Sequence, residues 1–171
     1  MTLHRLLEFK KDGNGIDNSD VHAALSEATA MTADPTECMR FDVMVNGEKI
    51  YDNVVASGFV VATSFGSTGY FGSIARTVFR DGFGVAFVAP TVGVNNLVLG
   101  AADTVKVMFR RGVRVNLAAD KDLMPVSAAE GDEFSFGCGS DQVAILGLKE
   151  FHCPECRALR HGTRICTQYL K

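Results

Sequence analysis

The chain has 171 residues, 47% of them hydrophobic, and a formal net charge of −3. This length suits one domain with a substantial core, and this composition excludes an intrinsically disordered chain. The apolar runs are too short to span a bilayer, and the small negative charge argues against a domain-wide electrostatic interface with nucleic acid.

The N-terminal part of the sequence predicts a short strand followed by an ambiguous segment. Residues 6–9 indicate a strand that runs into a turn over residues 10–15. From residue 18 to 30, apolar residues recur at helical spacing after a polar capping residue, which predicts a helix of about three turns. The later part of this segment, residues 27–31, equally fits the opening of a strand.

The rest of the sequence predicts a series of short strands. Residues 41–45 alternate apolar and polar side chains, and Asn46-Gly47 then forms a tight hairpin to a return strand over 49–55. Residues 59–63 and 84–89 are nearly continuous apolar runs, so we expect strands covered on both faces. Further strands are expected at 105–109, 113–117, 134–136 and 143–148. This spacing predicts a mainly β domain, of α+β type with one or two short helices, and mainly antiparallel pairing.

The turn after strand 59–63 is the candidate functional element. Residues 62–70 read Ala-Thr-Ser-Phe-Gly-Ser-Thr-Gly-Tyr and lead into a helix-like stretch. A helix start exposes free backbone N–H groups that suit the phosphate or ribose of a nucleotide, and glycines let the ligand approach closely. The alternative is an ordinary N-cap, in which Ser67 or Thr68 satisfies the first helical turn. The local pattern alone favours this simpler interpretation.

Several segments, in order, resemble the NAD kinase family, specifically its C-terminal β domain. Ala-Leu-Ser-Glu at 24–27 resembles the family's Ala-Leu-Asn-Glu, and 41–51 resembles its hairpin. Residues 58–70 resemble its strand followed by Thr-Pro-Thr-Gly-Ser-Thr-Ala-Tyr. Further matching positions are Val88-Ala89-Pro90, Leu97 to Leu99, Asp120 and Gly131-Asp132. The resemblance runs from about His4 to Gly147. It implies a NAD-kinase-like β-sandwich domain over 1–150, which leaves a Cys- and His-rich tail over 151–171.

The resemblance implies a site for an adenine dinucleotide, NAD or NADP, in this β domain. The residues that it implies are Ser26, Glu27, Gly66, Ser67, Thr68, Gly69, Tyr70, Ala89, Thr91 and Asp120. Thr68 and Gly69 would meet the ligand through the backbone and a hydroxyl. Tyr70 would pack or hydrogen-bond, and Glu27 would accept a hydrogen bond from a base or ribose.

Four positions depart from the family pattern and weaken the implied site. Ser26 replaces an adenine-facing Asn, and Phe65 replaces a polar residue before the glycine. Ser57 replaces the Asp of a strand-opening Asp-Gly, and Lys121 replaces the Gly of a later Asp-Gly. Because one lost hydrogen bond at a buried site costs about 1–3 kcal/mol, we expect binding to survive in weakened form.

The resemblance does not extend to the catalytic part of the family. The family's phosphoryl transfer uses a separate N-terminal α/β domain with a Gly-Gly-Asp-Gly motif. That motif is missing from this sequence, and Asp12-Gly13 is interpreted as a hairpin tip. No catalytic residue is therefore assigned. We expect the chain to contribute to NAD phosphorylation, and so to NADP biosynthesis, only with a separate ATP-binding subunit, and to form a homo-oligomer. The alternative is a catalytically inactive nucleotide-binding or structural interaction module.

The tail carries a candidate zinc site with the spacing C-x2-C-x4-H-x4-C. Its ligands would be Cys153, Cys156, His161 and Cys166, a donor set that suits tetrahedral zinc. The alternative is a tail helix or strand with free cysteines, which would leave Cys38 and Cys138 as small packing residues. An odd cysteine count predicts a reducing cytoplasm rather than a disulfide scaffold. A nucleic-acid-binding zinc protein is disfavoured by the net charge.

Overall fold

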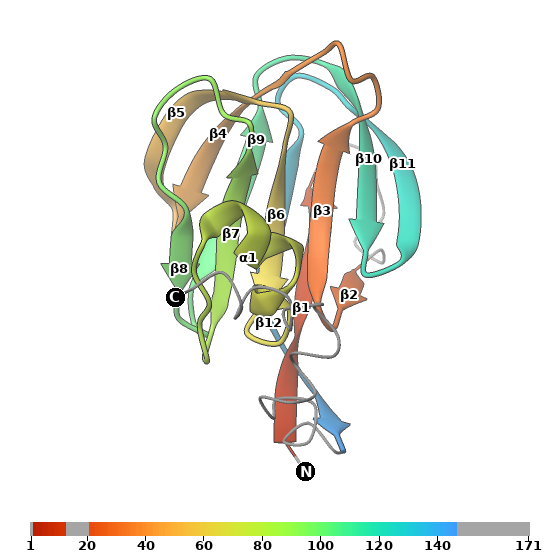
Figure 1. Cartoon of the computed structure of the whole chain (residues 1–171). Helices are drawn as coiled ribbons and strands as arrows, with labels where there is room; N and C mark the ends of the chain where they lie inside the picture. The colour runs from red at the N-terminus through yellow and green to blue at the C-terminus, as the bar shows by residue number, and fades with distance from the viewer. Residues whose placement is uncertain (1, 13–20, 147–171) are drawn as a thin grey trace, which may run out of the picture.

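Two six-stranded antiparallel sheets pack face to face in the computed structural model, which describes residues 2–12 and 21–146 (Figure 1). Sheet A has the strand order β2-β1-β12-β9-β4-β5, and sheet B the order β11-β10-β3-β6-β7-β8. The strands of sheet A are β1 (Thr2–Asp12), β2 (His22–Ala24), β4 (Met39–Val45), β5 (Glu48–Ala56), β9 (Thr104–Phe109) and β12 (Glu133–Ile145). Those of sheet B are β3 (Glu27–Thr32), β6 (Gly58–Thr63), β7 (Phe83–Val88), β8 (Leu97–Leu99), β10 (Val113–Ala119) and β11 (Asp122–Ala128). The mainly β fold expected from the sequence is confirmed.

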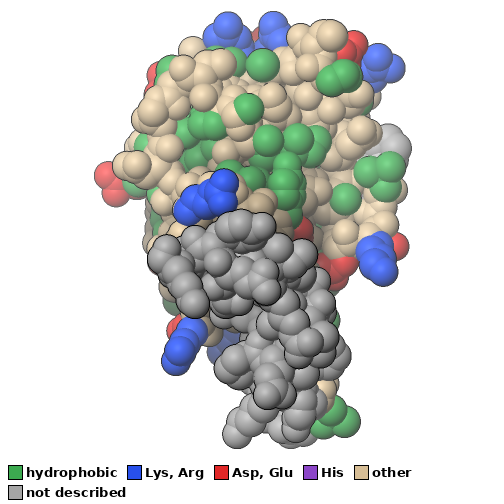
Figure 2. All heavy atoms as spheres, in the orientation of Figure 1, with side chains coloured by type: hydrophobic (Ala, Val, Ile, Leu, Met, Phe, Trp, Pro, Cys, Tyr) green, Lys and Arg blue, Asp and Glu red, His purple; other side chains and the backbone are tan. Residues whose placement is uncertain are grey.

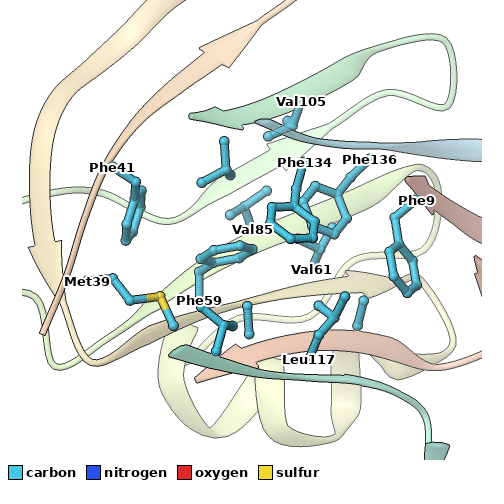
Figure 3. Close-up of a cluster of buried hydrophobic side chains, with 14 of the residues drawn as sticks. Phe9, Met39, Phe41, Phe59, Val61, Val85, Val105, Leu117, Phe134 and Phe136 are labelled. Atoms are coloured by element: carbon cyan, nitrogen blue, oxygen red, sulfur yellow. The ribbon is translucent and has the colours of Figure 1, made fainter. Parts of the chain in front are cut away.

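The core lies between the two sheets and is rich in phenylalanine. Figure 3 shows Phe41, Phe59 and Phe136 pointing into the space between the sheets. Phe59 meets both of its partners edge to face, at ring-centroid distances of 5.4 Å to Phe41 and 5.8 Å to Phe136. Such edge-to-face pairs add stability beyond their buried area. Alternate residues of each strand supply this layer, as the period of two requires.

The two helical segments lie on the outer face of sheet B, over β6 and β7 (Figure 1). They are a 3-10 turn, η1 (Gly66–Thr68), and one short α-helix, α1 (Tyr70–Ala75). Phe71 of α1 is fully buried against Val60, Ala62 and Ala86 of the sheet. This covering layer explains why β6 is apolar on both of its faces.

The helix expected over residues 18–30 is wrong for the residues that the structure describes. Residues 22–24 form β2 and residues 27–32 form β3, so the alternative interpretation of residues 27–31 is correct. Ala28 and Ala30 are buried at a spacing of two and face the core, as alternate residues of a strand do. β3 pairs with β6 on one side and with β10 on the other. Alanine fits a helix or a strand, so pairing with distant strands decides the conformation.

Some strand boundaries in the structure also differ from those expected from the sequence. Residues 134–136 and 143–145 belong to one long strand, β12, because it pairs with β1 over nearly its whole length. The structure adds β8 and β11, which the sequence analysis did not predict as strands. Among the described residues, no helix is long and apolar enough to cross a membrane.

Candidate functional site

The candidate site begins where β6 ends and the chain turns into η1. Gly66 passes so close to the turn before β3 that a Cβ on it would lie 2.1 Å from the carbonyl oxygen of Ser26. No side chain fits there, so this glycine is required by a close approach of two backbones. The same contact brings Ser26 and Glu27 beside residues 66–70, although about forty positions separate them in the sequence.

The side chains of this turn divide into an internal and an exposed set. Ser67 is buried, and its hydroxyl donates to the carbonyl oxygen of Ser64 at 2.8 Å and also bonds the backbone of Phe79. Thr68, Gly69 and Tyr70 are exposed, with 40% of Tyr70 accessible. The part of the turn that a ligand can reach is therefore residues 68–70.

Neither Ser67 nor Thr68 caps α1 through its side chain, so the simple N-cap interpretation does not describe this turn. The carboxylate of Glu27 lies at the helix start instead, where the Phe71 N–H points to Glu27 Oε2 at an N···O distance of 3.4 Å. An acidic group at a helix start is stabilised by the free N–H groups and the helix dipole. The acidic residue at the start of α1 therefore comes from β3, which is far from α1 in the sequence. Rules for helix capping, which consider only neighbouring residues, do not reveal it.

Asp120 closes the other side of the turn between β2 and β3. Its Oδ2 accepts a hydrogen bond from the N–H of Leu25 at 2.8 Å. Its Oδ1 accepts from Ser26 at 2.8 Å and from Glu27 at 3.1 Å. Asp120 has a positive φ of 51°, and its own N–H donates to the carbonyl oxygen of Glu27. The carboxylate is thus largely occupied by the backbone of residues 25–27.

Two carboxylates therefore face the same small region. Burial raises the pKa of Glu27 above its ordinary value, and the charge of Asp120 raises this pKa further. Hydrogen bonds from the backbone of Phe71 and Tyr70 work in the opposite direction. A phosphate brought to this helix start would meet negative charge, whereas a ribose hydroxyl or an amino group could donate to Glu27.

Ala89 and Thr91 lie at the opposite end of sheet B from this turn. Gly58 pairs with Val88 and Thr63 pairs with Phe83, so the end of β7 is next to the beginning of β6. Five residues of strand separate the two ends, which corresponds to about 16 Å. The structure brings together Ser26, Glu27, residues 66–70 and Asp120, but within one chain it does not bring Ala89 and Thr91 to them.

The sequence analysis missed Thr63, which links the two turns from the last position of β6. Its side chain is buried, and its hydroxyl donates to the Leu25 carbonyl oxygen at 2.7 Å and accepts from the Gly66 N–H at 3.2 Å. A polar residue that ends an otherwise apolar buried strand was the available sign. Next to it, Phe65 packs its ring edge to face on His4 of β1, at 5.4 Å.

The predicted zinc ligands, Cys153, Cys156, His161 and Cys166, lie outside the described residues, as does the boundary near residue 150. Among residues 2–12 and 21–146, no three His, Cys, Asp or Glu side chains are arranged to hold a metal ion. Cys138 contacts the core, and burial raises the pKa of its thiol, in keeping with the packing role expected for it.

The fold is similar to that of NAD kinases of known structure. Yeast NADH kinase in complex with NADH aligns with a TM-score of 0.70 and 20% sequence identity, over 82% of this chain and 41% of the kinase chain. The NAD kinase of Archaeoglobus fulgidus in complex with ATP aligns with a TM-score of 0.61 and 22% identity, over 82% of this chain and 53% of the kinase chain. No protein-family model and no curated protein matches the sequence.

These comparisons confirm the resemblance to NAD kinases at the level of the fold. The chain spans about half the length of each of the two kinases.

Proposed function

We propose that this chain is a NAD-kinase-like protein that binds an adenine dinucleotide, NAD or NADP, at the turn formed by residues 66–70 and Ser26–Glu27. One observation carries the proposal. The exposed residues Thr68, Gly69 and Tyr70 lie beside the Glu27 carboxylate, in a fold shared with kinases whose structures hold NADH or ATP. A small number of polar groups placed around an aromatic ring is a common feature of small-molecule sites.

Glu27 supplies the hydrogen-bond acceptor of this site, and Tyr70 the aromatic surface. A ribose hydroxyl or adenine amino group donates to Glu27, while the Tyr70 ring packs on the ligand. Thr68 and Gly69 offer a hydroxyl and a backbone that a ligand can approach closely. Ser26 offers one short hydroxyl where the family has an amide, so we expect a dissociation constant of roughly 10 μM to 1 mM.

Phosphorylation of NAD requires more than this chain supplies. In-line phosphoryl transfer depends on groups that position and neutralise the ATP phosphates, and the sequence contains no Gly-Gly-Asp-Gly motif. We infer that residues 1–171 take part in NADP biosynthesis only together with an ATP-binding half that they do not contain, such as one carried by a separate subunit. Alone, the chain binds the dinucleotide without phosphorylating it.

The proposed site also bears on assembly. Ala89 and Thr91 are about 16 Å from the turn along the strand, so we propose that they contact the part of the ligand bound at this turn from a second copy. Figure 2 shows hydrophobic side chains gathered on the face that carries α1. Val98 belongs to this face, because it pairs with Gly84, on which a Cβ would touch Phe71 and Phe79. We therefore propose a homo-oligomer that forms through this face.

The alternative is a catalytically inactive module in which a zinc-bound tail serves assembly. The internal hydrogen bonds of Ser67 and Asp120 favour this alternative, because they leave fewer groups for a ligand. A cytoplasmic location remains a prediction from the cysteine count.

Titration calorimetry with NAD, NADP and ATP separates these functions. We expect heat of binding with NAD that is lost in Tyr70→Ala. Ile50→Ala is the matched control, because Ile50 on sheet A is as exposed as Tyr70 and lies away from the turn. Absence of heat at millimolar NAD, or equal binding by Tyr70→Ala, would support the inactive module. Conversion of NAD to NADP by the purified chain alone, with ATP or polyphosphate, would contradict partner dependence.

A further inference from the structure

Thr63 hydrogen-bonds both loops of the proposed site, the turn at residues 25–26 and the turn that begins at Gly66. Besides donating to Leu25 at 2.7 Å, its hydroxyl oxygen lies 3.1 Å from the Ser26 carbonyl oxygen and accepts from the Gly66 N–H. Its own N–H donates to the same Ser26 carbonyl oxygen at 2.9 Å. With 2% of its surface accessible, Thr63 does not reach a ligand.

Asp120 holds the same loop from the opposite side. Residues 25 and 26 belong to no strand, so their N–H groups have no partner in a sheet ladder. The Asp120 carboxylate accepts from these N–H groups and from that of Glu27. This uses three of the roughly four lone-pair positions that a carboxylate offers.

We propose that Thr63 and Asp120 are positioning residues of the dinucleotide site, which hold Ser26 and Glu27 against residues 66–70 without contributing the ligand contacts themselves. The inference rests on the proposed function. It also changes the role of Asp120, from a ligand contact implied by the family resemblance to a support for the backbone.

The fit between the two loops explains why such support is needed. Gly66 has no free space toward Ser26, so a small shift of residues 25–27 displaces both turns. Glu27 follows directly in the chain, and its carboxylate meets α1 at Phe71. A binding group must be held to within about 0.5 Å by its supporting residues if it is to keep its affinity.

Three substitutions test this role. Thr63→Val keeps the shape and removes the hydroxyl, and Thr63→Ser restores the hydroxyl. Asp120→Asn replaces one acceptor oxygen by an amide donor, while asparagine tolerates the positive φ at this position. Thr32→Val is the matched control, because Thr32 lies at the opposite end of β3 and its hydroxyl contacts Ser57.

Two measurements are made on each full-length variant, namely NAD affinity by calorimetry and amide hydrogen exchange. We expect Thr63→Val and Asp120→Asn to weaken NAD binding by about tenfold or more, as lost hydrogen bonds to charged or buried groups do. Exchange should accelerate at Leu25, Ser26, Glu27 and Gly66. Thr63→Ser and Thr32→Val should stay within about threefold of the parent affinity.

Unchanged affinity and unchanged exchange in Asp120→Asn and Thr63→Val would overturn the inference, as would an equal loss in Thr32→Val. If the parent protein binds no NAD, the proposed function fails. The exchange of the amides at 25–27 and 66 then decides whether Thr63 and Asp120 hold the two loops together.

Discussion

The Oε2 atom of Glu27 lies 3.4 Å from the backbone nitrogen of Phe71, so a carboxylate from β3 occupies the start of α1. The sequence suggests that this helix start could receive a phosphate. With Glu27 in place and Asp120 nearby, the position favours a group that donates hydrogen bonds. Under the proposed function, the charge at the helix start therefore selects which part of the dinucleotide binds there.

Glu27→Gln tests this selectivity. We expect the parent protein to bind NAD more tightly than NADP, because the 2′-phosphate of NADP carries negative charge toward Glu27. The substitution removes one repulsive charge, so it should narrow the difference between the two ligands by about tenfold, or about 1.4 kcal/mol. Calorimetric titration of both proteins with both ligands measures this change. Equal preference for NAD in the parent and the variant would show that the phosphate does not approach Glu27.

The role of Gly66 gives a prediction that is independent of any ligand. In Gly66→Ala the new methyl group would lie 2.1 Å from the Ser26 carbonyl oxygen, so the two turns must separate. We expect the free energy of unfolding to fall by about 3 kcal/mol, the upper part of the usual range for overpacking. Gly93→Ala is the control, because a Cβ on Gly93 has no neighbour within 4 Å. Urea unfolding of both variants measures this difference. Equal stability of Gly66→Ala and Gly93→Ala would show that the close approach of Gly66 to Ser26 does not constrain the fold.

These contacts also show what the sequence could and could not reveal. Alternation and apolar runs predicted the hairpin at Asn46-Gly47 and the doubly covered strand at 59–63, because both depend on neighbouring residues. The family resemblance implied a site that includes Ser26, Glu27 and residues 66–70, and the fold brings these residues together. The bond from Leu25 to Asp120 joins positions 95 apart, and that from Thr63 to Leu25 joins positions 38 apart. No local pattern encodes such contacts, which is why the strand at residues 22–24 and the role of Thr63 were missed, and why residues 27–31 could be assigned to a strand only as an alternative to a helix.

A buried carboxylate in sheet A, that of Asp42, makes the free energy of unfolding depend on pH. Asp42 is fully buried, and its Oδ2 lies 2.7 Å from Lys49 Nζ and 2.5 Å from Arg110 Nη2. Burial alone would raise the pKa of Asp42. The Arg110 guanidinium, the Asn53 N–H and the Lys49 ammonium outweigh it and hold this pKa well below its ordinary value. The stabilisation is therefore complete above the unfolded-state pKa of about 3.9, and it is lost as the pH falls through the lower folded-state pKa.

Asp42→Asn should accordingly lower the free energy of unfolding at pH 7 by about 3 kcal/mol, because it leaves two cations without their buried partner. At pH 3 the difference from the parent protein should be smaller. Asp52→Asn is the control from the same cluster, since Asp52 is 67% exposed and its ion pairs with Lys49 and Arg110 are open to water. We expect the control to change stability by less than about 1 kcal/mol. A loss for Asp42→Asn that does not depend on pH would contradict this assignment.

The proposed oligomer can be tested through the shared site. If Ala89 and Thr91 reach a ligand from a second copy, the protein should form dimers or larger assemblies under the conditions in which it binds NAD. Light scattering across a hundredfold range of dilution measures the assembly. Val98→Glu, which places a charge on the exposed face of sheet B, should shift the population toward monomer and weaken NAD binding together. A monomer at every concentration, with NAD binding intact, would contradict a shared site.

The tail prediction depends on chemistry outside the described part of the chain. We expect one zinc ion per chain, held by Cys153, Cys156, His161 and Cys166, because residues 153–166 contain four donors of suitable softness. Metal binding by such a segment stabilises its own folded form. Chelation should therefore speed hydrogen exchange after Phe151 and leave Val60 to Thr63 unchanged, since those core residues are fully or almost fully buried. Elemental analysis of protein purified without a histidine tag gives the direct measurement. Cys153→Ser should lose zinc and Cys38→Ser should keep it, whereas zinc well below one equivalent in the parent protein would show that the spacing is coincidental.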